Sequence, residues 1–252
     1  MPMHDWTRVS SGTFDAFHNA WITHIQESLN AGVLPAPFYA LGEQRLGDLI
    51  PDVLTLHEFD PSELPTGPAS SDDVGGILAL TDVQPRVRFS QEALEDVAFQ
   101  LKRQRSVVIR HSNGDRVVAI IEIVSPANRH SIQTLDDFAD KVISSLRDGI
   151  HVTVIDPFPT GPRDPDGIHG YIWQRLMENN YTQPHDLPMT MVSYTAGHPI
   201  KAWVEPIQVG DTLTPMPLFI TPEHYIELPL EETYEQSWAG VPARWKRVIE
   251  NG

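Results

Sequence analysis

The sequence contains no cysteine, which excludes a disulfide framework and a thiolate metal site. Basic residues are also scarce: 18 Lys and Arg stand against 34 Asp and Glu, and the formal net charge at pH 7 is −16. Because affinity for nucleic acid comes mainly from Lys and Arg neutralising phosphates, this balance disfavours a nucleic-acid partner unless the basic residues gather on one face. It does not exclude a metal site, since a bound cation reverses the local field.

Long apolar runs are absent as well. No segment is long and apolar enough to cross a bilayer, and the first residues are not followed by the apolar stretch of a signal peptide. We therefore expect a cytoplasmic protein with no membrane contact. Its partners are unknown from the sequence, and homo-oligomer formation stays open. The 252 residues predict a single elaborated domain, with a core at about 14–156 and an extension of strands and helices at about 157–252.

The central segment of the chain spans residues 117–156. Seven of the eight residues from Val117 to Val124 are apolar and mostly β-branched, which predicts a strand covered on both faces. A helix from an N-cap at Thr134 to Arg147 and a strand at 151–156 follow, so we expect a right-handed crossover between parallel strands. Before them, Asn113-Gly114 predicts a tight type I′ turn between strands 106–111 and 115–124.

The rest of the chain supplies further elements. Apolar spacing predicts a helix that begins at an N-cap at Thr13 or Asp15 and ends at Gly32. Its His18 and His24 are interpreted as packing residues rather than metal ligands. Pro51 is expected to begin a strand at 52–56, and residues 38–45 are either a short helix or an extended piece. The other expectations are a mobile surface loop at 60–76, strands at 188–196 and 200–209, and helical periodicity at 231–250.

These elements predict an α/β (α+β) fold with a mixed central sheet and flanking helices. Within it, Glu122 interrupts the apolar strand, and a carboxylate there is costly unless it is paired, hydrogen-bonded or bound to a cation. Two explanations carry equal weight. In the first, Glu122 forms a buried ion pair with Lys141 or Arg116, or accepts a bond from a backbone amide. In the second, Glu122 belongs to a site for a divalent metal.

The block VVAIIEIVSPANR at 117–129, the helix that contains Lys141 and the strand HVTVID at 151–156 resemble the bacterial family catalogued as domain of unknown function 4058. The segment FHNAW near the start and the proline-rich strands near the end also fit, so the resemblance covers nearly the whole chain. The family has no established activity, and the resemblance therefore implies a fold and a set of motifs rather than a reaction.

A more distant resemblance bears on mechanism. Glu122 followed by Ser125-Pro126, a lysine on the next helix and a strand that ends in Asp-Pro are similar to Uma-type proteins of the PD-(D/E)xK restriction-endonuclease-like superfamily. The resemblance implies a restriction-endonuclease-like core with added strands and a Mg²⁺-dependent phosphodiesterase or nuclease. Asp52, Glu122 and Lys141 would be catalytic, and Glu43, Asp52 and Glu122 would hold the metal.

The chain departs from that pattern in two places. Val124 stands where the pattern has a lysine, so Lys141 on the helix would replace it, and a long insertion separates Asp52 from Glu122. Asp52 could instead cap a strand, and Lys141 could belong to a solvated helix face. The alternative function is therefore a non-catalytic binding or assembly module that retains the nuclease-like fold.

Three further residues follow Glu122 at the carboxyl end of its strand, where open α/β sheets place ligands. Ser125, Asn128 and Arg129 could bind an anionic substrate there, although a turn stabilised by Ser and Asn is the favoured explanation. The sequence has neither the G-x-S-x-G motif of serine hydrolases nor a glycine-rich phosphate loop. The candidate chemistry therefore rests on the carboxylates and Lys141.

Overall fold

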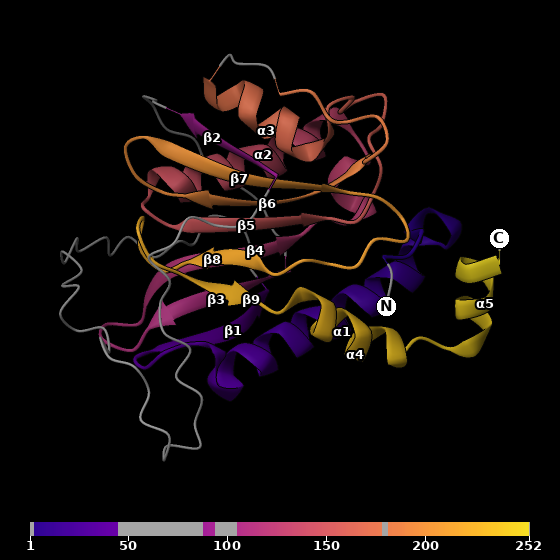
Figure 1. Cartoon of the computed structure of the whole chain (residues 1–252), viewed down its shortest axis with the longest axis horizontal. Helices are drawn as coiled ribbons and strands as arrows, with labels where there is room; N and C mark the ends of the chain where they lie inside the picture. The colour runs from indigo at the N-terminus through magenta and orange to yellow at the C-terminus, as the bar shows by residue number, and fades with distance from the viewer. Residues whose placement is uncertain (1–2, 45–87, 94–104, 178–180, 252) are drawn as a thin grey trace.

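The computed structural model describes residues 3–44, 88–93, 105–177 and 181–251, and its centre is a seven-stranded sheet in the order β1-β3-β4-β5-β6-β7-β2 (Figure 1). Strands β4 and β5 are parallel, and all other neighbours are antiparallel. The prediction of a mixed sheet with flanking helices is thus confirmed. The strands are β1 (Phe38–Gln44), β2 (Phe89–Ala93), β3 (Arg105–His111), β4 (Arg116–Ile123), β5 (His151–Asp156), β6 (Met189–Thr195) and β7 (Ile200–Ile207).

Helices cover both faces of this sheet (Figure 1). On one face lie α2 (Ile132–Arg147) and α3 (Gly167–Met177), which pack against each other. On the other face α1 (Ser11–Ser28) and α4 (Leu230–Ala239) run side by side, and the hairpin of β8 (Met216–Phe219) and β9 (Tyr225–Leu228) lies with them. Alternate residues of β4 and β5 point to the two faces, so each face has its own apolar core.

The predicted crossover β4-α2-β5 is present. Helix α2 buries the expected stripe of Leu135, Phe138, Val142 and Leu146, and β5 is buried along its whole length. Its N-cap is Ser131 rather than Thr134: the Thr134 amide donates to Ser131 Oγ at 3.1 Å, and the Ser131 amide donates to Thr134 Oγ1 at 3.0 Å. This reciprocal pair is a capping box, which the sequence shows as Ser followed three residues later by Thr.

Three other boundaries differ from the predictions. The turn between β3 and β4 has four residues, and the positive φ angles fall on Gly114 and Asp115 rather than on Asn113 and Gly114. Helix α1 begins after Ser10 and ends at Ser28, and a π-helical segment (Leu29–Val33) continues it to Gly32, where φ is 122° and the helical conformation breaks. The final helical segment is two helices, α4 and α5 (Ala243–Asn251), because Gly240 and Pro242 interrupt the backbone bonding between them.

Several open predictions are settled and others lie outside the described residues. Residues 38–44 form strand β1, which resolves the choice between helix and extended chain. The strand expected at 52–56, its Asp52 and the loop expected at 60–76 lie outside the described ranges. Among the residues that the structure describes, no helix has the length and apolarity needed to span a membrane.

Candidate functional site

Glu122 and Lys141 meet in the interior between β4 and α2. Lys141 Nζ lies 2.5 Å from Glu122 Oε1, and the two side chains are 6% and 2% exposed. Ile121 and Ile123, on either side of Glu122, face the core under α1, so the alternation of the strand turns Glu122 toward α2. The interpretation of Lys141 as part of a solvated helix face is therefore wrong, and of the two proposed ion-pair partners the structure shows Lys141.

The position next to Glu122 on the neighbouring strand is occupied by Ser106. Val107 of β3 pairs with Ile121 of β4, and one step further along this antiparallel ladder Ser106 comes opposite Glu122. Residues opposite each other in such a ladder point to the same face, with Cβ atoms about 5 Å apart. Ser106 is fully buried, and its Oγ has no hydrogen-bond partner among the described residues.

Of the two other residues of the predicted metal site, the structure describes the backbone position of Glu43 and does not describe Asp52. Glu43 of β1 is the ladder partner of Ser106, so the backbone positions of Glu43, Ser106 and Glu122 form one row across three strands. Asp52 lies outside the described residues, and the two strands beside β4 are β3 and β5, neither of which contains it. Within the described ranges, no group of three His, Asp or Glu side chains is arranged to hold a metal ion.

A second polar cluster lies at the carboxyl end of β4 and β5. Arg129, from the short 3-10 helix that follows β4, donates from Nη2 to Asp156 Oδ2 at the end of β5 and lies 2.9 Å from Asp164 Oδ2. Its Nη1 donates to the backbone carbonyl oxygens of Phe158 and Pro159 at 3.3 and 2.6 Å. The guanidinium therefore joins the two strand ends and the following loop.

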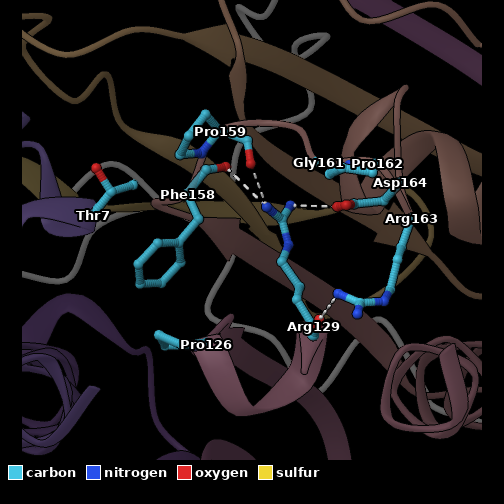
Figure 2. A pocket seen from close by; sticks show the side chains of 9 residues that line it. All are labelled: Thr7, Pro126, Arg129, Phe158, Pro159, Gly161, Pro162, Arg163 and Asp164. Carbon is cyan, nitrogen blue, oxygen red and sulfur yellow. Dashed lines mark hydrogen bonds and ion pairs between the residues drawn. The ribbon is translucent and has the colours of Figure 1, made fainter. Parts of the chain in front are cut away.

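This cluster borders a cavity of about 250 Å³, shown in Figure 2. Its wall is mostly apolar, and Asp164 and the exposed Arg163 bring opposite charges to it. Because the Arg129 guanidinium contacts two carboxylates and two carbonyl oxygens, its charge is compensated within the protein. The lining residues are Thr7, Pro126, Arg129, Phe158, Pro159, Gly161, Pro162, Arg163 and Asp164.

Burial controls the ionisation of the two carboxylates. It raises the pKa of Asp156 from 3.8 to about 6, even though Arg129 and the amide of Phe158 oppose the shift by favouring the charged form. Burial also raises the pKa of Asp164, again against the attraction of Arg129. The penalty of removing these charged carboxylates from water thus exceeds the electrostatic stabilisation that the Arg129 guanidinium gives them.

Ser125 and Asn128, the other two predicted substrate-binding residues, bond to each other. Asn128 Oδ1 accepts from the Ser125 amide at 2.7 Å and from Ser125 Oγ at 3.0 Å, which is the Ser/Asn turn that the sequence left as an alternative. Among the predicted packing histidines, His18 is buried with Nε2 3.0 Å from the Ile123 carbonyl oxygen, and His24 pairs with Glu27 at the surface.

Sequence analysis missed three residues of these sites. Asp156 had a usable signal, because a carboxylate at the last position of a buried strand needs a partner. Asp164 had none, since its partner Arg129 lies 35 positions earlier in the chain. Ser106 is a single polar residue at the start of an apolar strand, and only the register of β3 against β4 places it beside Glu122.

Comparisons of this chain with family models, with curated proteins and with solved structures found no match.

The Glu122–Lys141 pair predicts a strongly non-additive double-mutant cycle. Glu122→Gln and Lys141→Met should each lower the free energy of unfolding by about 3 kcal/mol, because each leaves one buried charge without its main partner. The double variant should be more stable than the sum of the two losses implies, by at least about 1 kcal/mol. Urea unfolding of the four proteins measures this coupling, and additive losses would contradict it.

Asp156 predicts a pH-dependent stability. Its pKa is raised on folding, so the native state binds the proton more tightly, and the free energy of unfolding should fall as pH rises from about 4 to about 6. The decline due to this group should be about 2 kcal/mol between pH 4 and pH 6. It is measured as the difference between wild type and Asp156→Asn across that range. A difference that stays constant or grows with pH would show that Arg129 keeps Asp156 ionised throughout.

Proposed function

We propose that the chain is a Mg²⁺-dependent phosphodiesterase of the PD-(D/E)xK type, with Asp52, Glu122 and Lys141 as its catalytic residues and Glu43 as an assisting ligand. One observation carries the proposal. The distant resemblance names Glu122 and a lysine displaced onto the following helix as members of one site, and these two side chains, 19 positions apart in sequence, lie in contact.

The described side chains include the type of ligand atom, oxygen, that the proposed ion prefers. Mg²⁺ prefers oxygen ligands and retains several waters, and the row beside Lys141 offers the Glu122 carboxylate and the Ser106 hydroxyl. Ser106 Oγ is buried without a hydrogen-bond partner among the described residues, whereas Glu122 Oε1 is buried in contact with Lys141 Nζ. In the proposal the second carboxylate is that of Asp52.

The roles of the residues follow from this arrangement. A bound Mg²⁺ would supply a water activated for attack on a phosphodiester. Lys141 would stabilise the negative charge that develops on the phosphate, and in the resting protein it holds Glu122 in place. The parallel pair β4 and β5, bridged by α2, gives both side chains rigid supports. The proposal places the protein in the cytoplasm, with phosphodiesters as its substrate class.

The second candidate is a non-catalytic binding or assembly module that retains the nuclease-like core. One observation favours it: the Glu122 side chain is 2% exposed and is already paired with a cation, so its charge has a partner without a metal. A net charge of −16 also repels a polyanionic substrate. In this alternative the pair serves the fold, and a ligand would bind elsewhere.

Calorimetric titration of Mn²⁺ and of Mg²⁺ separates the two candidates. Wild type should bind one ion specifically at about 0.1 M salt, where screening weakens diffuse attraction to the acidic surface. Glu122→Gln should lose this binding, because the amide keeps the shape of the side chain and removes its charge. The same ions should support hydrolysis of a chromogenic phosphodiester by wild type and not by the variant.

Two controls test whether a loss of binding is specific to Glu122 and whether the variant is folded. Glu205→Gln removes another buried carboxylate, one that pairs with Arg88 at the far side of the sheet, and should leave the binding unchanged. Circular dichroism checks that Glu122→Gln is folded, and Glu122→Gln/Lys141→Met provides a variant without either buried charge. Folded wild type that binds no ion, or binding that Glu122→Gln retains, would overturn the phosphodiesterase proposal.

A further inference from the structure

We infer that the cavity beside Arg129 is a binding site for a small carboxylic acid that carries an apolar ring. Arg163 at the rim binds the carboxylate, and the ring lies against Phe158 and the neighbouring prolines. The inference goes beyond the proposed function, because the site uses neither Glu122 nor Lys141 and needs no metal ion.

The position of the cavity in the fold is one where ligands bind. It lies at the carboxyl ends of β4 and β5, the only parallel neighbours in the described part of the sheet. One wall comes from the segment after β4, with Pro126 and Arg129, and another from the loop after β5, at 158–164. Open α/β sheets place their ligands beyond the carboxyl ends of parallel strands, because the loops that follow the strands meet there.

Arg129 holds these two walls together. Its guanidinium contacts the carboxylates of Asp156 and Asp164 and donates to the carbonyl oxygens of Phe158 and Pro159. The loop after β5 is thereby fixed to the segment after β4 before any ligand arrives. A preformed cavity saves the free energy that ordering two loops would cost on binding. Arg129 therefore shapes the cavity, while its own charge is used within the protein.

The size and the wall of the cavity suit a single ring. A volume of about 250 Å³ holds roughly eight waters at about 30 Å³ each, which is less than a drug-sized ligand needs. Phe158, which is 8% exposed, and Pro126, Pro159 and Pro162 line it (Figure 2). Proline has no amide hydrogen and a fixed ring, so these residues form a stiff apolar surface against which a flat ring packs.

Arg163 supplies the charge that a ligand meets. The side chain of Asp164 is only 3% exposed, and its Oδ2 lies 2.9 Å from Arg129 Nη2, so this carboxylate is turned inward. Arg163 is exposed, donates from Nη1 to the Arg129 carbonyl oxygen at 3.4 Å, and forms no ion pair with a described carboxylate. Its other N–H groups are available to a carboxylate, whose two oxygens match the guanidinium fork.

The test uses benzoate as the probe, with benzamide and acetate as comparisons. Each is titrated into ¹⁵N-labelled protein while the amide signals are recorded. Benzoate should shift the signals of Gly161, Arg163 and Asp164 saturably. It should bind more tightly than benzamide, which has the ring without the charge, and than acetate, which has the charge without the ring. Arg163→Gln should weaken benzoate binding about fivefold, the upper range for a surface ion pair, and leave benzamide binding unchanged.

Arg116→Gln is the matched control. It removes the same charge at the opposite end of β4 and should leave the affinity for benzoate unchanged. Urea unfolding checks that both variants are as stable as folded binding requires. Absence of saturable shifts with benzoate, equal affinities for benzoate and benzamide, or equal losses in Arg163→Gln and Arg116→Gln would each overturn the inference. None of these results bears on metal binding at Glu122, so the two proposals fail separately.

Discussion

The contact between Glu122 and Lys141 is the interaction on which the centre of this structure depends. Each charge alone would be costly in the interior, because neither side chain is more than 6% exposed and removal from water is only partly offset by pairing. The pair fixes the rotation of α2 about its axis relative to β4, since Lys141 must face Glu122 while Phe138 and Val142 face the apolar core. The orientation of α2 relative to β4 in turn determines how the crossover leads into β5.

Buried polar groups lie at two levels along strand β4, and their charges are balanced differently at each level. At Glu122 the opposite charges neutralise each other, and Ser106 adds a hydroxyl without a described partner. At the carboxyl end of the strand, Arg129 lies between Asp156 and Asp164, and burial raises the pKa of both carboxylates. The first level pairs a buried carboxylate with a buried ammonium, whereas the second holds the strand ends and the following loop together.

The sequence predicted those parts of the fold whose signals are local. The apolar run of β4, the stripe of α2 and the turn residues between β3 and β4 specify strand, helix and hairpin, and Glu122 stood out because it breaks the run. Contacts between distant segments were not predictable in the same way. The pairing of β2 with β7 at the sheet edge, the bond of Arg129 to Asp164 and the position of Ser106 all depend on register and topology, which residue periodicity does not encode.

The most direct test of the account is where a paramagnetic ion binds in solution. We would add substoichiometric Mn²⁺ to ¹⁵N-labelled protein and record which amide signals broaden. The account predicts selective broadening around Glu122 in β4 and Ser106 in β3, with loss of the effect in Glu122→Gln and sharp signals from β7 throughout. Broadening confined to acidic surface segments, or unaffected by Glu122→Gln, would contradict a metal site built on the buried pair.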